Sequence, residues 1–228
     1  QQSGANSADI AQRLAVAERL DNHTGLNNRR GFEERFAALY QSVLQGKSKA
    51  GLLYIQLDNI GKISSSLGLQ GVDTTIKQVA EVLDEMLEDA HISRFSDTAF
   101  TVLVENVTAD ALKALAERIR QRISDTLIEV DKRTTNTTAS IGIVKIDSNA
   151  AEPQVLLERA VEAINHIRVE TENRGDAIHI YDPSEHAIND DNALAEYLVN
   201  AITNNHFEVF FQPIYDVNND RSDFFEAY

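Results

Sequence analysis

Ile92-Ser-Arg-Phe-Ser-Asp-Thr-Ala-Phe-Thr-Val-Leu-Val-Glu105 is the stretch of sequence that decides the fold. Two runs rich in β-branched and aromatic residues, Ile92–Phe95 and Phe100–Glu105, flank the turn-forming residues Ser96-Asp97-Thr98. Two such runs around a short polar turn are typical of a β-hairpin. We therefore expect two adjacent antiparallel strands in the middle of the chain.

Helices with one apolar face are predicted on both sides of this hairpin. Leu69–Glu88 and Thr108–Leu127 carry apolar residues at helical spacing. The apolar runs Gly51–Leu57 and Thr137–Ile146 have the length of buried strands. The resulting order, β-α-β-β-α-β, is the split βαβ pattern. It predicts an α/β (α+β) domain in which helices flank a central, mainly antiparallel sheet.

The remaining patterns divide the chain into three parts. Asp182-Pro183-Ser184 marks a boundary, because proline interrupts regular structure and the residues that follow are rich in carboxylates and aromatic rings. We expect a linker helix within residues 1–20, a first domain at 21–183 and the beginning of a second domain at 184–228. Further helices are predicted at 6–20, Arg29–Gln45, Pro153–Glu170 and Asn192–Asn204, and further strands at Ala177–Tyr181, Phe207–Phe211 and Asp223–Tyr228.

The composition argues against several classes of protein. The chain has 228 residues, of which 36 are acidic and 21 basic, and a formal net charge of −15. Because such a surface repels phosphate backbones, we expect no nucleic-acid partner. No apolar stretch approaches the ~20 residues of a membrane span, so we expect no membrane contact. The lack of cysteine excludes disulfides and thiol chemistry and favours a cytoplasmic location. The chain begins at Gln1 rather than Met, so we expect it to be a piece of a longer protein.

Four segments carry the motifs of one known family, in its order and with its spacing. Asp21-Asn-His-Thr-Gly-Leu-Asn-Asn-Arg-Arg30 is close to D-x-L-T-G-L-x-N-R-R, and Gly51–Asp73 has the form of the first strand and the following helix. Ser93–Phe100 occupies the place of R-[YF]-G-G-D-E-F, and Thr138–Ile143 is similar to T-x-S-I-G-[IV]. Over residues 15–182 the chain thus resembles the GGDEF family of diguanylate cyclases, which join two GTP molecules into cyclic di-GMP. The resemblance implies a nucleotidyl-cyclase-like fold.

The chain departs from this family where the catalytic metal ions are held. The family uses carboxylates of a D-x-D-x-F-K strand and of the hairpin, and hard cations such as Mg²⁺ require oxygen ligands. By resemblance, Gln56 stands in place of the first carboxylate and Ala99 in place of the hairpin glutamate. Asp58 remains a weak metal-binding candidate, since it lies two residues from Gln56 and points to the same face of a strand. The resemblance therefore implies a chain that is not an active cyclase.

The nucleotide-binding positions are changed in part. The hairpin reads Ser96-Asp97-Thr98-Ala99-Phe100, and its first two residues replace glycines that let the backbone approach phosphate closely. Of the two guanine-reading positions implied by the resemblance, one holds Ser64 in place of Asn and the other keeps Asp73. Arg168 keeps a positive charge at a phosphate-facing position. We expect no cofactor in this chain, except Mg²⁺ bound together with GTP if the degenerate site still binds nucleotide.

A second resemblance begins after the boundary. Asn205-His-Phe-Glu-Val-Phe-Phe-Gln-Pro-Ile214 resembles the opening of EAL phosphodiesterase domains, N-x-[FL]-x-[LV]-[YF]-[YF]-Q-P-I. Glu226-Ala227-Tyr228 stands at the position of Glu-Ala-Leu, so Glu226 is implied as a metal ligand in a complete EAL domain. Such a domain is a (β/α) barrel of ~250 residues, and residues 184–228 suffice only for its beginning. A downstream EAL domain of the same protein is the expected partner, either as an active phosphodiesterase or as a receptor.

Several functions stay open at this point. The favoured one is an inactive regulatory domain that couples an upstream input to the EAL domain. The second is a GTP-sensing domain that controls the phosphodiesterase, and the third is a dimerisation module that pairs two chains through the helix at 6–20 or through the C-terminal tail. A residual cyclase is the least favoured. The six histidines show no H-x-x-x-H spacing, so we expect them to have surface or core roles rather than to bind metal.

Overall fold

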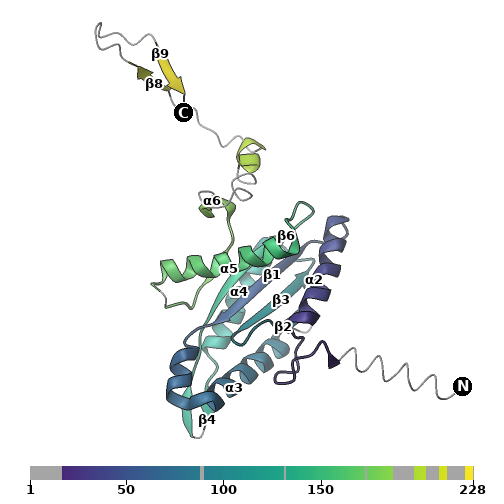
Figure 1. Ribbon diagram of the computed structural model, residues 1–228, viewed down its shortest axis with the longest axis vertical. Helices are drawn as coiled ribbons and strands as arrows, with labels where there is room; N and C mark the ends of the chain where they lie inside the picture. The colour runs from purple at the N-terminus through teal and green to yellow at the C-terminus, as the bar shows by residue number, and fades with distance from the viewer. Residues whose placement is uncertain are drawn as a thin grey trace, which may run out of the picture. The chain divides into compact units, whose positions relative to one another are not determined.

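β1 (Ala50–Leu57) is the central strand of a five-stranded sheet (Figure 1). It pairs antiparallel with β3 (Ala99–Glu105) on one side and with β6 (Ala139–Ile146) on the other. β2 (His91–Arg94) pairs antiparallel with β3, and β7 (Ile178–Ile180) runs parallel to β6 at the opposite edge. The strand order β2-β3-β1-β6-β7 confirms the predicted, mainly antiparallel sheet.

The structure is a computed structural model that describes residues 17–87, 90–130, 132–172, 174–186, 198–203, 211–214 and 224–227. The chain divides into two compact units, Gln1–Tyr181 and Asp182–Tyr228. The five-stranded sheet belongs to the first unit. The division falls beside Pro183, where the composition of the sequence changes.

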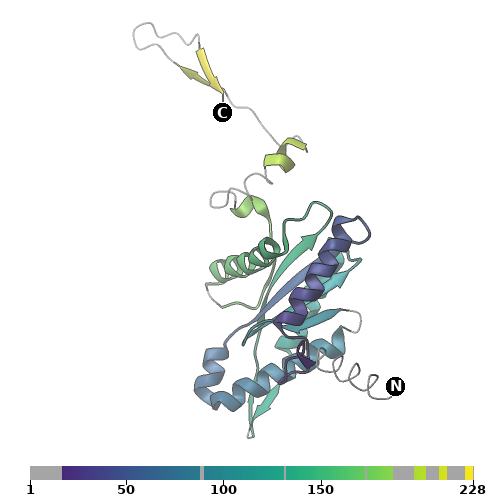
Figure 2. The same ribbon diagram turned by 45° about the vertical axis from the view of Figure 1, so that its right-hand side comes forward.

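Four helices cover the two faces of the sheet (Figures 1 and 2). α2 (Arg29–Leu44) and α5 (Pro153–Glu170) pack on one face, and α3 (Ile60–Met86) and α4 (Ala109–Ser124) pack on the other. This arrangement confirms the predicted α/β fold in which helices flank a central sheet.

Alternate side chains of β1 enter two separate apolar cores. Leu52 and Tyr54 belong to the core beneath α2 and α5, whereas Leu53 and Ile55 belong to the core beneath α3 and α4. Because successive side chains of a strand point to opposite faces, Gln56 lies on the same face as Tyr54. The end of β1 therefore presents Gln56 on the side of the sheet that α2 and α5 cover.

Two parts of the first unit differ from the prediction. α3 begins at Ile60 rather than at Leu69, and it continues through Gly68, whose φ of 69° interrupts the helical conformation. The residues before Gly68 include three consecutive serines, so their periodicity gave no apolar face to detect. The hairpin of β4 (Ile128–Val130) and β5 (Arg133–Thr135) is also absent from the prediction, because three-residue strands are too short to show alternation.

The N-terminal helix predicted at 6–20 falls mostly outside the described part of the chain, which begins at residue 17. Helical structure does not extend to residue 20, because Leu20 forms a β-bridge with Asn27. The homodimer expected through this helix or through the C-terminal tail stays a prediction.

The second unit contains short elements. α6 (Pro183–His186) and a helical segment at 198–203 precede β8 (Phe211–Ile214), which pairs antiparallel with β9 (Phe224–Ala227). The strand predicted at Phe207–Phe211 lies outside the described residues up to position 210. Among the helices that the structure describes, none combines the length and the apolar composition needed to cross a membrane.

Candidate functional site

An ion pair holds the hairpin between β2 and β3 against the loop that precedes α2. Arg94 Nη1 lies 3.3 Å from both carboxylate oxygens of Asp21. The same carboxylate accepts hydrogen bonds from the backbone nitrogen and the hydroxyl of Thr24, at 2.9 and 2.8 Å. Burial alone would raise the pKa of Asp21, but the Thr24 hydrogen bonds and the charge of Arg94 outweigh it and lower the pKa. Two motif segments far apart in the sequence are thus joined in space.

Gln56 and Ala99, at the two expected metal-binding positions, are direct partners in the pairing of β1 with β3. The side-chain nitrogen Nε2 of Gln56 donates hydrogen bonds to the hydroxyl and carbonyl oxygens of Thr98, at 2.9 and 3.1 Å. The side chain of Ala99 is fully buried. The fold therefore brings both positions together, with neutral groups at each.

The tip of the hairpin closes on itself. The backbone nitrogens of Phe95 and Ser96 both donate to the carbonyl oxygen of Ala99, at 2.9 and 3.2 Å. Ser96 and Asp97 are exposed, and neither adopts the positive φ that glycine would permit. Phe100 is fully buried in the core beneath α3 and α4. Two backbone donors of the tip are thus engaged within the hairpin itself.

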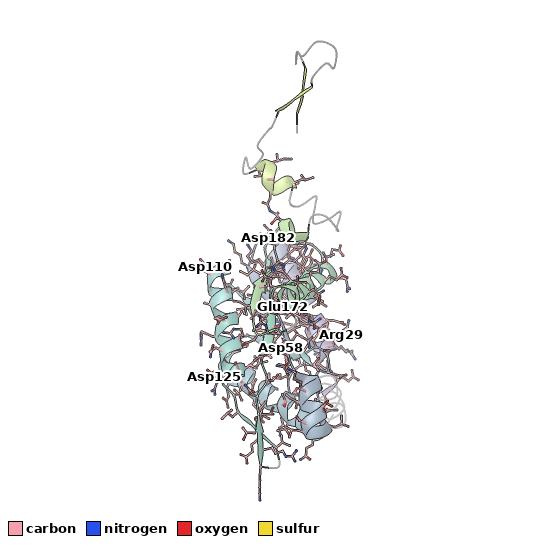
Figure 3. All side chains as sticks on the ribbon, turned by 90° about the vertical axis from the view of Figure 1, so that its left-hand side faces the viewer. Arg29, Asp58, Asp110, Asp125, Glu172 and Asp182 are labelled. Carbon is pink, nitrogen blue, oxygen red and sulfur yellow. The ribbon has the colours of Figure 1, made fainter. Side chains whose placement is uncertain are left out.

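Asp58 directly follows β1, and its carboxylate is enclosed by protein donors. Oδ2 accepts hydrogen bonds from the Thr138 hydroxyl at 2.8 Å and from the backbone nitrogen of Asp176 at 2.9 Å. Oδ1 accepts one from the Ser140 hydroxyl at 2.9 Å. A Cβ at Gly175 would lie 2.4 Å from Oδ1, and Gly175 has a φ of 72°, so a larger residue there would be strained and would displace this carboxylate. Asp58, labelled in Figure 3, thus joins the ends of β1 and β6 to the loop before β7.

Arg29 and Arg168 supply positive charge near the hydroxyl of Tyr54. Burial raises the pKa of Tyr54, and the charge of Arg29, a hydrogen bond with Ser96 and the charge of Arg168 oppose this rise without cancelling it. Phe95 packs edge-on against Tyr54 with ring centroids 5.6 Å apart, and the Arg29 guanidinium lies 4.8 Å from the centre of the Phe95 ring. Because guanidinium groups form charge-assisted hydrogen bonds with phosphate, Arg29 and Arg168 are suited to binding phosphate beside Tyr54.

A groove of about 370 Å³ lies along α3, and Asp73 forms part of its lining. The carboxylate of Asp73 is exposed, and its backbone carbonyl oxygen lies 3.0 Å from Nε2 of His23. Ser64 lies on α3 before the break at Gly68, and Arg168 lies on α5. Neither of these two is among the residues that line the groove: His23, Gln70, Asp73, Thr74, Lys77, Gln78 and Glu81.

The family of the first unit follows from comparison with known proteins. The profile described as "Diguanylate cyclase, GGDEF domain" matches residues 18–174. The chain belongs to the GGDEF family. Residues 18–174 contain the paired positions Gln56 and Ala99 and also Asp58, so the GGDEF domain includes all three.

Relatives of this GGDEF domain include proteins named for opposite reactions. It is 30% identical to the cyclic di-GMP phosphodiesterase NbdA of Pseudomonas aeruginosa over 67% of the chain and 19% of NbdA. It is 27% identical to diguanylate cyclase A of Treponema denticola over 56% of the chain and 35% of that cyclase. The chain therefore spans only about a fifth and a third of these curated relatives.

A solved structure shows the same fold. The crystal structure of the FimX GGDEF domain from Pseudomonas aeruginosa matches with a TM-score of 0.65 and 27% identity. The match covers 70% of this chain and 98% of the FimX chain. The GGDEF domain described above is thus a complete counterpart of that domain.

Sequence reasoning about the GGDEF domain missed the cluster of Arg29, Tyr54 and Phe95. Two signals were present. Arg29 lies inside the first family motif, and Tyr54 lies two residues before Gln56 and hence on the same strand face.

The side chain of Glu226 lies outside the described residues, although the backbone places Glu226 opposite Gln212 in the β8–β9 pair.

Proposed function

We propose that this GGDEF domain is a regulatory domain that lacks cyclase activity and belongs to a cyclic di-GMP signalling protein. The pairing of Gln56 with Ala99 is the observation that carries this proposal. Two carboxylates at these opposed positions would form a cation site, whereas an amide and a methyl group provide no charge for Mg²⁺.

The chemistry that is lost accounts for the predicted inactivity. Joining two nucleotides develops negative charge on a phosphoryl group, and metal ions held by carboxylates stabilise that charge. Loss of one such electrostatic contact typically costs ~10²-fold or more in rate. Here both carboxylates are missing, and the Asp58 carboxylate is engaged by Thr138, Ser140 and the Asp176 backbone.

A continuous set of contacts supports a role in coupling to the second unit. Asp58 binds the backbone of Asp176, and the Asp176 carboxylate in turn lies 2.6 Å from Arg120 Nη1 on α4. β7 follows within two residues, and the backbone nitrogen of Tyr181 donates to the Ile143 carbonyl oxygen at 2.9 Å. The next residue begins the second unit. We infer that changes at the end of β1 reach the chain segment that leads into a downstream EAL domain.

GTP sensing is the second candidate function, and two observations favour it. Asp73 keeps an exposed carboxylate in the groove along α3, where it is suited to accept hydrogen bonds from a guanine base. Arg29 and Arg168 keep positive charge near the hairpin. In this second function, GTP binds without reacting, and its binding shifts the conformation of the GGDEF domain and thereby the activity of the EAL domain.

A calorimetric titration of the chain with GTP and Mg²⁺ tests both versions. We expect no cyclic di-GMP in the mixture afterwards, and its formation would overturn the proposal. The Asp73→Ala variant is compared with Asp84→Ala, which removes another exposed carboxylate of α3 outside the groove. Binding that is lost only in Asp73→Ala supports the GTP sensor. Binding that is unchanged in Asp73→Ala, or missing altogether, contradicts the sensor and leaves regulation through protein contacts.

A further inference from the structure

Three side chains that can bind transition metals meet where α5 packs beside β7. They are His166 and Glu170 on α5 and His179 on β7, and their ligand atoms all lie within 4.8 Å of one another. His166 Nε2 lies 3.1 Å from Glu170 Oε1. The imidazole rings of His166 and His179 stack with centroids 3.9 Å apart and an angle of 22° between their planes.

The fold explains why these residues converge. His166 and Glu170 are four residues apart on α5, a spacing that places two side chains on the same helix face. β7 runs parallel to β6, which α5 covers, so the middle residue of β7 can face the last turns of the helix. Helical spacing combined with a residue from an adjacent strand is not visible as an H-x-x-x-H pattern in the sequence.

We propose that His166, Glu170 and His179 form a binding site for a divalent transition metal ion, with Zn²⁺ as the ion that fits best. Two imidazoles and one carboxylate form a ligand set known from zinc sites, with a water molecule as the fourth ligand. At Zn–ligand distances of ~2.0–2.2 Å, tetrahedral ligands lie about 3.3 Å apart. The 3.1 Å between His166 and Glu170 is already close to this separation.

Metal binding requires one local rearrangement. An imidazole nitrogen binds a metal in the plane of its own ring, so two stacked rings cannot both direct a nitrogen at one ion. The His179 ring therefore has to turn out of the stack when the ion binds. The ion replaces any proton shared between His166 and Glu170, and that proton passes to solvent.

The ligand types determine which metal ions bind, and the position of the site determines which part of the domain a bound ion affects. Imidazole ligands favour Zn²⁺, Ni²⁺ and Cu²⁺ over Mg²⁺, which prefers oxygen ligands. The Glu170 side chain is 62% exposed, so the ion can enter from solvent. A bound ion would tie the C-terminal end of α5 to His179 of β7, three residues before the second unit begins at Asp182. The ion would thus stiffen the segment that leads out of the GGDEF domain.

Titration of the untagged chain with Zn²⁺ alone, followed by calorimetry and thermal unfolding, tests the site. We expect one saturable site per chain and a rise in Tm with Zn²⁺, since the ion binds the folded state. His166→Ala and His179→Ala should each weaken Zn²⁺ binding by about 100-fold or more, and Glu170→Gln by about tenfold or more. His91→Ala removes a histidine of β2 that lies outside the cluster and should leave the affinity unchanged.

Two results would overturn the site. The first is the lack of saturable Zn²⁺ binding by the wild-type chain. The second is undiminished binding in Glu170→Gln and His179→Ala, which would place the ion elsewhere. Because Glu170 is exposed, Glu170→Gln keeps the test valid even if a histidine variant fails to fold. In NMR spectra, Zn²⁺ should also shift the ring protons of His166 and His179 together, and Mg²⁺ should not.

Discussion

Gln56 and Ala99 face each other across the pairing of β1 and β3, and the Gln56 amide is bonded to Thr98 beside them. Positions separated by more than forty residues in the sequence are thus neighbours in the sheet. Neither side chain carries a charge, so the pair offers no carboxylate to a metal ion. The amide also has a structural role, because it links Thr98, directly before β3, to the end of β1.

This role predicts the effect of introducing a carboxylate at position 56. Gln56→Asp should lower the free energy of unfolding by about 1–3 kcal/mol at neutral pH, because two hydrogen bonds are lost and a carboxylate then faces the Thr98 carbonyl oxygen. Chemical denaturation measures the change. Gln41→Asp on the exposed side of α2 is the control and should change stability far less. Equal stability of Gln56→Asp and wild type would show that the amide contacts have no structural role.

Asp58 is expected to be structural. Asp58→Ala removes the acceptor for the Thr138 and Ser140 hydroxyls and for the Asp176 backbone nitrogen, and should cost about 1–3 kcal/mol of unfolding free energy. Asp84→Ala, at an exposed position of α3, should stay within about 0.5 kcal/mol of wild type. If chemical denaturation gave Asp58→Ala the same unfolding free energy as Asp84→Ala, the structural role of Asp58 would be contradicted.

The lowered pKa of Asp21 predicts acid sensitivity. Because its folded pKa lies below the usual value of 3.8, the ionised carboxylate stabilises the fold above that value. The contribution is lost as pH falls through the lowered pKa. The stability difference between wild type and Asp21→Asn should thus be largest near pH 7 and shrink toward about pH 2. Denaturation at a series of pH values measures it, with Asp84→Asn as the control, and a difference that does not vary with pH would refute the assignment.

We predict that position 142 requires glycine because a larger side chain would clash with α5, and not because the backbone needs a positive φ. A Cβ at this position of β6 would lie 2.1 Å from the carbonyl oxygen of Ala160 on α5. Gly142→Ala should therefore destabilise the fold by about 1–3 kcal/mol. Gly61 in α3 has open space around its Cβ position, and Gly61→Ala should be neutral or stabilise by up to about 1 kcal/mol. Comparing Tm values of the two variants gives the test, and equal effects would contradict it.

Most of the first unit could be predicted from the sequence, because its strands and helices have strong apolar patterns. The run Gly51–Leu57 shows the central strand, and the polar turn at Ser96–Thr98 shows the hairpin. Apolar periodicity alone did not show the first half of α3, because the serines before Gly68 lack an apolar face, although the resemblance of Gly51–Asp73 to a strand followed by a helix implied a helix there.

Only part of the candidate site could be predicted from the sequence. Motif spacing identifies Gln56 and Ala99, but it does not show that Thr98 satisfies the Gln56 amide. The donors around Asp58 come from β6 and from the loop before β7, more than seventy residues away in the sequence. His166 and His179 likewise meet only through the packing of α5 beside β7. Such contacts depend on the tertiary fold, which local patterns do not encode.

The most direct test of the proposed loss of cyclase activity is to incubate the chain with GTP and Mg²⁺ and to measure cyclic di-GMP by mass spectrometry. An active GGDEF domain under the same conditions serves as the positive control. We predict no cyclic di-GMP above the level without protein, because Gln56 and Ala99 offer no charged ligand to the metal ions. Steady accumulation of cyclic di-GMP that depends on Mg²⁺ and on the folded chain would contradict the proposal.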